Sequence, residues 1–261
     1  MQGMTSFDDI YDRPDPRAYF TRLAPLSYEI PHHAQAVFRR TAAERRLADT
    51  GSAVLDLCCS YGINAALLNH DLTLADLYAH YTGPEARELT TAELIDRDKA
   101  FYASRRRPDA VPVIGLDIAR NALDYAQAVG LLDAVHPDNL EEHAPSPALG
   151  AAMADAGLIT CTGGGTFLSR RTFAALLECA RRPVWVSAFV LRTVPYAPVA
   201  SCLAGFGLTT RSDPERTYPQ RAFTGPQERR AAVSAARLAG LDPTGREADG
   251  HHHAVLYESR P

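Results

Sequence analysis

The chain of 261 residues is long enough for one large domain with a sizeable core. Its net charge of −4 disfavours nucleic-acid binding, which requires a basic surface. The five cysteines contain no Cys-x-x-Cys pair, and no apolar run approaches the ~20 residues of a membrane span. We therefore expect a cytoplasmic protein with reduced thiols that binds neither nucleic acid nor a membrane.

The first 50 residues mix prolines, aromatic and acidic side chains before a helical stretch, and we expect them to form a helical cap. Residues 51–261 are predicted to be the main domain, in which short apolar runs alternate with helical segments. Residues 69–110 interrupt this alternation as a helical insertion, and residues 191–225 form a long, loop-rich second insertion. The apolar runs, which we interpret as strands, lie at 53–57, 113–117, 134–136, 157–161, 184–190 and 254–258.

Strands that alternate with helices predict βαβ units and a mostly parallel sheet. Right-handed crossovers make such a sheet doubly wound, with helices on both faces. Ligands bind at the carboxyl ends of its strands, where the winding reverses. The turns after Leu57, Asp117 and Cys161 are therefore the first places to look for a site.

The turn after the first strand carries the main motif. Residues 54–62 read Val-Leu-Asp-Leu-Cys-Cys-Ser-Tyr-Gly, which resembles motif I of class I S-adenosylmethionine-dependent methyltransferases. That motif places three alternate glycines after the strand, and here Cys58, Ser60 and Gly62 stand at those positions. Small side chains let the backbone approach a cofactor closely, but a position with positive φ suits cysteine and serine less well than glycine.

The second strand ends at Asp117, and the helix after it carries Leu-x-x-Ala, which resembles the second motif of the same family. The resemblance implies a seven-stranded Rossmann-like sheet and S-adenosylmethionine as the cofactor. It also implies that Asp117 binds the ribose hydroxyls, with Ile118 against the adenine. Asp76 is an alternative ribose ligand, although its surroundings match the motif less well.

The resemblance implies further cofactor contacts. Asp138 would meet the adenine amino group, and Asn139 is an alternative for this role. Asp56 would lie near the methionine ammonium group. The remaining expected cofactor contacts are Tyr28, Cys58, Ser60, Gly62 and Thr160.

We interpret residues 191–225 as part of an acceptor pocket, with an arginine that pairs a substrate carboxylate. No catalytic base is assigned, because His136, His143 and the run 251–253 are all candidates. No metal site is expected, since three adjacent histidines on a strand cannot all face one ion. The expected substrate contacts are Thr162, Arg192, Tyr196, Tyr218 and Arg221.

The sequence thus favours a methyltransferase that acts on an oxygen or nitrogen of a small molecule. One alternative is a protein that binds S-adenosylmethionine in a regulatory or non-methylating role. Another is an NAD(P)-dependent oxidoreductase, which requires a Gly-x-Gly-x-x-Gly turn that this chain lacks. A homodimer is possible, and the helical insertion serves as a lid, a dimer contact or both.

Overall fold

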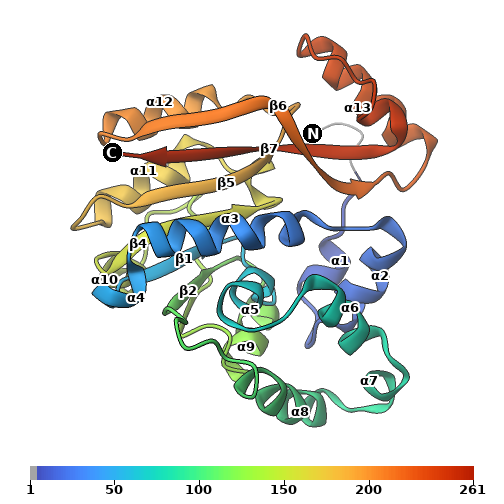
Figure 1. The fold of residues 1–261 in the computed structure, drawn as a ribbon, viewed down its shortest axis with the longest axis vertical. Coiled ribbons are helices and arrows are strands. Elements are labelled where there is room, and N and C mark those ends of the chain that lie inside the picture. Colours follow the sequence, from blue (N-terminus) through green and yellow to red (C-terminus); the bar gives the residue numbers. More distant parts are fainter. Residues whose placement is uncertain (1–4) are drawn as a thin grey trace.

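The structure is a computed structural model, and it describes residues 5–261. Seven strands form one sheet in the order β3-β2-β1-β4-β5-β7-β6 (Figure 1). All run in the same direction except β7, which lies antiparallel between β5 and β6. The predicted doubly wound, mostly parallel sheet of seven strands is confirmed. The strands are β1 (Ala53–Leu57), β2 (Val113–Leu116), β3 (Ala134–His136), β4 (Ala156–Thr162), β5 (Trp185–Leu191), β6 (Thr209–Ala222) and β7 (His251–Arg260).

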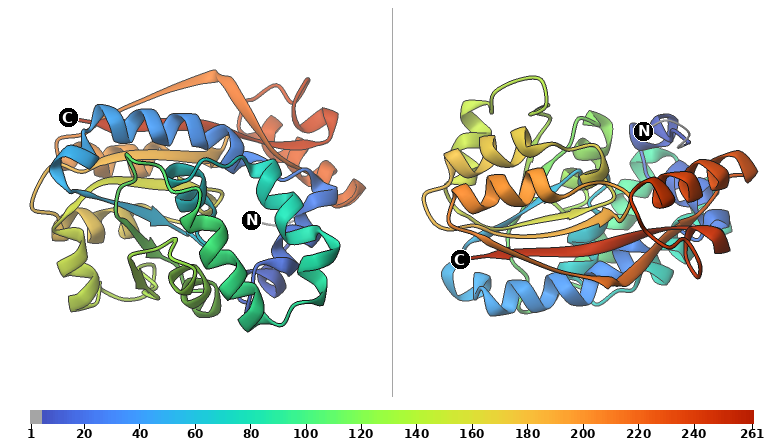
Figure 2. Two further views of the ribbon diagram at one scale, coloured as in Figure 1. Left: turned by 60° about the horizontal axis from the view of Figure 1, so that its bottom comes forward. Right: turned by 90° about the horizontal axis from the view of Figure 1, so that it is seen from above.

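Helices cover both faces of the sheet (Figure 2). Val54 and Val113 face one core and Leu55 and Ile114 the other, because successive side chains of a strand alternate between faces. The first core contains residues of α3 (Ile30–Glu44), α5 (Ile63–Asn69) and α9 (Arg120–Ala128); the second contains residues of α10 (Pro147–Met153), α11 (Arg170–Cys179) and α12 (Ala197–Gly205).

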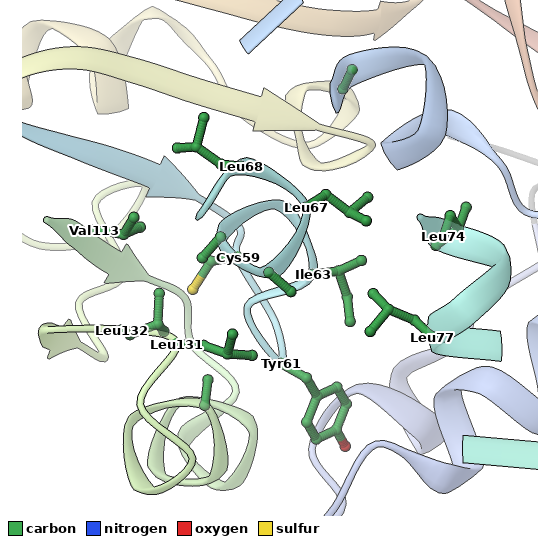
Figure 3. Close-up of a cluster of buried hydrophobic side chains, with 14 of the residues drawn as sticks. Cys59, Tyr61, Ile63, Leu67, Leu68, Leu74, Leu77, Val113, Leu131 and Leu132 are labelled. Atoms are coloured by element: carbon green, nitrogen blue, oxygen red, sulfur yellow. The ribbon is translucent and has the colours of Figure 1, made fainter. Parts of the chain in front are cut away.

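The short helix α5 is buried along its whole length, and it fixes the position of the turn before it. Its sequence, Ile-Asn-Ala-Ala-Leu-Leu-Asn, is apolar on nearly every side, as expected for a helix enclosed by other elements. Figure 3 shows Ile63 and Leu67 on the side of Leu74 and Leu77, while Cys59 of the preceding turn points towards Leu132.

The amino-terminal segment and the insertion pack together at one end of the molecule, where α2 contacts α6 (Figure 1). Asp98 of α8 is fully buried and accepts hydrogen bonds from the hydroxyls of Tyr81 in α6 and Tyr125 in α9. This network ties the insertion to the main domain. The elements are α1 (Asp8–Tyr11), α2 (Arg17–Leu23), η1 (Ala24–Leu26) and α4 (Leu47–Thr50) before the sheet, and α6 (Leu74–Thr82), α7 (Pro84–Glu88) and α8 (Thr91–Ala103) in the insertion.

Residues 191–225 form α12 and the long strand β6, so the expectation of a loop is wrong. β6 is an edge strand with mostly exposed polar residues, and it contains Pro214 and Pro219, which edge strands tolerate. It therefore has no apolar run by which to recognise it. After β6 come α13 (Pro226–Leu238) and η3 (Glu247–Asp249). Among residues 5–261, no helix has the length and apolar character needed to cross a membrane.

Candidate functional site

A cavity of about 820 Å³ lies at the carboxyl ends of β1, β2 and β4. The winding of the sheet reverses between β1 and β4, so the cavity is where a doubly wound fold places its ligand. Its volume is in the range of ~300–1,000 Å³ that is usual for small-molecule sites. Residues of the amino-terminal cap, among them Tyr11 and Tyr28, line it together with strand-end residues.

The turn between β1 and α5 keeps the backbone shape of a glycine-rich turn. φ is 57° at Cys58, 48° at Ser60 and 74° at Gly62, so all three alternate positions are left-handed. A non-glycine residue costs roughly 1–2 kcal/mol in this region. The turn therefore holds strain at two positions beside the cavity, as is common at functional sites.

The two cysteines of the turn each pack against a glycine elsewhere. A β-carbon on Gly164, in η2 (Gly164–Thr166), would lie 2.5 Å from the sulfur of Cys58. A β-carbon on Gly115 would lie 2.9 Å from the sulfur of Cys59. Burial raises the pKa of both thiols, which favours their protonated form.

Asp117 lies at the end of β2 on the cavity wall. One carboxylate oxygen accepts a hydrogen bond from the backbone N–H of Ser60 at 2.8 Å, and the other from that of Ala119 at 2.9 Å. Burial raises the pKa of this carboxyl above its usual value. The adjacent Ile118 is 69% exposed and lines the cavity, as an apolar surface that a flat ring can cover.

Asp56 lies beneath the cavity and does not line it. Its Oδ1 accepts hydrogen bonds from Asn64 Nδ2 at 3.0 Å and Thr160 Oγ1 at 2.9 Å, and its Oδ2 has no partner. Burial raises the pKa of Asp56 to about 7, although these two hydrogen bonds act to lower it. Asn64 also donates to Thr162 Oγ1 at 3.0 Å and does line the cavity, so it connects the buried carboxyl to the site.

Asp138 and Asn139 follow β3 and line the cavity. Both oxygens of Asp138 accept hydrogen bonds from Ser146, at 2.6 Å from the backbone N–H and at 3.2 Å from the hydroxyl. Glu141, which the sequence analysis missed, also lines the cavity. Burial would raise its pKa, but hydrogen bonds from Thr172 and Ser169 outweigh burial and hold the pKa below the usual value.

Tyrosines line the end of the cavity beneath the cap. Tyr11 and Tyr19 meet edge to face with ring centroids 5.6 Å apart, and Tyr19 meets Tyr28 in the same way at 6.1 Å. Burial raises the pKa of Tyr11 to about 12 and those of Tyr19 and Tyr28 well above the usual value. These rings are neutral and electron-rich at physiological pH.

Two of the five expected substrate residues, Thr162 and Arg221, line the cavity. The guanidinium of Arg221 is already committed, because Nη2 lies 2.6 Å from Glu228 Oε1 and Nη1 lies 3.1 Å from Oε2, with both side chains buried. Gln220, beside Arg221 at the end of β6, also lines the cavity and was not predicted.

The other three expected substrate residues lie outside the cavity, which corrects the prediction that they line one pocket. Arg192 is buried with its Nε 3.0 Å from Glu247 Oε1. Tyr196 stacks on Tyr257 in the core on the opposite face of the sheet. Tyr218 packs against the first core. Tyr218 belongs to β6, where pairing with β7 sets its direction, whereas Arg192 follows β5 and Tyr196 is the N-cap of α12.

Three of the expected cofactor contacts also lie outside the lining, namely Asp56, Thr160 and Gly62. Gly62 is the N-cap of α5 and packs near Ala126 and Leu131. Asp76, the alternative to Asp117, is exposed and caps α6 through Thr73.

None of the histidines among residues 5–261 lines the cavity. His136 is buried in β3, His143 is exposed, and the run 251–253 belongs to β7. In the same part of the chain, no group of three or more His, Cys, Asp or Glu side chains is arranged to hold a metal ion.

Neither a protein-family model nor a curated protein matches this sequence. Several solved structures are similar to this chain. Magnesium protoporphyrin IX methyltransferase from Synechocystis PCC 6803, with bound SAH, is 12% identical over 90% of this chain and 85% of that one, with a TM-score of 0.44. A SAM-dependent methyltransferase from Aquifex aeolicus is 12% identical over 93% and 97%, with a TM-score of 0.41. A functionally unknown protein from Deinococcus radiodurans R1 is 17% identical over 90% and 89%, with a TM-score of 0.46.

The order and direction of the seven strands are those of the Rossmann-like sheet that the sequence analysis predicted. The solved structures above are too distant to indicate a function. The residues of its own cavity indicate what the chain binds.

Proposed function

We propose that this chain is an S-adenosylmethionine-dependent methyltransferase that acts on a small molecule. The observation that carries the proposal is the turn at residues 58–62, which has three alternate left-handed positions and opens into the cavity beside Asp117. A left-handed backbone at Cys58 and Ser60 is energetically unfavourable. Its presence in this turn indicates that the shape of the turn is needed for function.

The residues present fit this cofactor. Asp117 would hold the ribose hydroxyls, because each of its oxygens accepts one hydrogen bond from a backbone N–H and keeps further acceptor capacity. Ile118 would pack against the adenine, with Asp138 and Asn139 at its edge. When bound, the cofactor supplies a methyl group on a sulfonium, which is already an activated leaving group. The protein's part is to align the acceptor and exclude water.

The charge of the cavity also supports this cofactor. The described lining holds five carboxylates, and its one basic residue, Arg221, is neutralised by Glu228. S-adenosylmethionine carries a sulfonium and an ammonium against one carboxylate, and its net positive charge suits such a site. Nicotinamide dinucleotides carry two phosphates, which the cavity would repel.

A small acceptor is favoured because the amino-terminal cap covers the cavity, which leaves a partly enclosed space rather than an open surface. The oxygen or nitrogen that accepts the methyl group is a separate question. A regulatory protein that binds the cofactor without turnover is the second candidate, and the strained turn is equally consistent with it.

Thermal-shift measurements with S-adenosylhomocysteine and with NADH test the proposal. We expect S-adenosylhomocysteine alone to raise the melting temperature, and Ile118→Asp to abolish the rise, since a carboxylate would replace the apolar surface. Mass spectrometry of S-adenosylhomocysteine released from S-adenosylmethionine and an acceptor library then separates an enzyme from a binding protein. A shift with NADH alone would overturn the proposal.

A further inference from the structure

We infer that the methyl acceptor is the nitrogen of an organic amine, and that the tyrosine-lined end of the cavity recognises the positive charge that this nitrogen gains on methylation. The inference rests on the proposed function and narrows its substrate class from oxygen or nitrogen to nitrogen. It depends on three features of the cavity, namely its charge, its aromatic lining and the lack of histidine and lysine among its described lining residues.

The charged groups of the described lining are mainly acidic. The carboxylates belong to Asp8, Asp12, Asp117, Asp138 and Glu141. An anionic acceptor, such as a carboxylate, a phosphate ester or a phenolate, would have to enter this negative field without a free cation to pair with.

The two arginines that the sequence analysis placed at the acceptor pocket already have buried partners. Arg221 forms two hydrogen bonds to Glu228 and a third to the carbonyl of Ala222 at 2.9 Å. Arg192 is buried beside Glu247, away from the cavity. Withdrawing Arg221 towards a substrate would leave Glu228 as an uncompensated buried charge, which is strongly unfavourable.

The aromatic lining favours a cation. Tyr11, Tyr19 and Tyr28 line this end of the cavity, with Asp8 one helical turn before Tyr11 on α1. The face of a tyrosine ring attracts ammonium groups, and such rings form the cages that bind methylated ammonium ligands. Tyr11 meets Tyr19 edge to face with ring centroids 5.6 Å apart, and it lies on the same helix as Asp8.

An amine also makes the least demand on a general base. The described lining residues include no histidine or lysine, so a base there would have to be a carboxylate. A phenol or alcohol acceptor needs a base to take its proton in the transition state. An amine can lose its proton to bulk water before it reacts, and its lone pair then attacks without further help.

The charge balances in this step. The nitrogen lone pair forms the new bond to the methyl carbon while the carbon–sulfur bond breaks, and that bonding pair stays on sulfur. The positive charge of the sulfonium passes to nitrogen, and the products are S-adenosylhomocysteine and a methylated ammonium ion. One positive charge is therefore present throughout, and the acidic, aromatic wall stabilises it at the acceptor end.

The test uses the full chain saturated with S-adenosylhomocysteine and three probes of the same shape. These are choline, which is cationic, 3,3-dimethylbutan-1-ol, which is neutral, and 3,3-dimethylbutanoate, which is anionic. We expect calorimetry to show choline binding at least about twofold more tightly than the neutral probe, from the range of ~0.5–2 kcal/mol for a cation over an aromatic ring. The anion should show no binding.

Two variants locate the effect. Tyr11→Leu should reduce the preference for choline about two- to tenfold, whereas Tyr11→Phe, which keeps the ring, should retain it. Equal binding of choline and the neutral probe, preferential binding of the anion, or no binding of any probe to a chain that binds S-adenosylhomocysteine would each overturn the inference. Failure to bind S-adenosylhomocysteine itself would instead overturn the proposed function.

Discussion

The side chain of Cys58 occupies the space that Gly164 leaves empty. A β-carbon on Gly164 would lie 2.3 Å from the β-carbon of Cys58 and 2.5 Å from its sulfur. Cys58 stands where the resemblance places a glycine, and Gly164 lies opposite it, just after β4. The missing side chain at Gly164 therefore makes space for the side chain at Cys58, although the two residues are about a hundred positions apart.

This pairing predicts a compensating double variant. Gly164→Ala should destabilise the fold by about 1–3 kcal/mol through overpacking, as measured by urea unfolding. Adding Cys58→Gly should recover most of that loss, because the clashing side chain is gone and the left-handed φ then suits the residue. Additive losses in the double variant would show that the two residues do not interact.

Ser60 offers a second test of the turn. Its φ is 48° and its buried hydroxyl has no hydrogen-bond partner. Ser60→Gly should therefore stabilise the protein by about 1 kcal/mol and leave binding of S-adenosylhomocysteine intact. Ser27→Gly is the matched control, since Ser27 is also left-handed at φ 49° but lies outside the cavity lining. A loss of stability in Ser60→Gly would contradict the strain argument.

Much of the fold follows from the sequence, because buried parallel strands are short apolar runs and helices show one apolar face. Leu55 and Ile114 lie within such runs, and both strands are where the pattern predicts them. β6 was missed because an exposed edge strand buries few side chains, and its neighbour β7 supplies the pairing that defines it. The residues of β6 alone do not show that β7, about forty residues later in the chain, pairs with them.

The site was predicted less completely. Asp117, Ile118 and Asp138 end strands, so topology alone brings them to one edge. Arg192 ends up away from the cavity, because its direction depends on a buried partner that the sequence does not reveal. Asn64 was missed, although a single polar residue near the start of an otherwise apolar helix is a usable signal.

Glu228 holds the amino-terminal segment over the cavity. It accepts hydrogen bonds from the backbone N–H of Thr5 at 2.9 Å, from that of Thr224 at 2.7 Å, and from Arg221. Glu228→Gln should cost about 3 kcal/mol, because it leaves a buried guanidinium uncompensated. Amide hydrogen exchange should rise most at residues 5–12. Glu215→Gln, at an exposed carboxyl, should leave exchange there unchanged.

The carboxyl of Glu228 also makes the stability of the fold depend on pH. Burial would raise the pKa of Glu228, but hydrogen bonds from His252, Arg221 and Thr224 outweigh burial and hold it well below the usual value. Its stabilisation is therefore present above the unfolded pKa of ~4.3 and is lost as the pH falls below that value. Unfolding followed from pH 5 to 3 should show a shallower loss in Glu228→Gln than in the natural chain.

Asp56 affects the pH dependence of stability in the opposite direction to Glu228. Its pKa is about 7 in the folded chain, above the unfolded value of ~3.9, so the folded state holds a proton that the unfolded state releases. Stability is then highest below about pH 4 for this group and falls as the pH rises to about 7. Asp56→Asn should remove this loss, so that its stability relative to the natural chain improves between pH 5 and 8. An unchanged pH profile would show that Asp56 is ionised in the folded state.

The most direct test of the central claim is calorimetric titration of the purified chain with S-adenosylhomocysteine, beside Asp117→Ala and the control Asp76→Ala. We predict micromolar binding to the natural chain and to the control. Asp117→Ala, with its fold checked by circular dichroism, should lose about ten- to hundredfold in affinity, because a charged hydrogen-bond acceptor is removed. No binding to the natural chain, or equal binding to Asp117→Ala, would contradict the assignment of this cavity to S-adenosylmethionine.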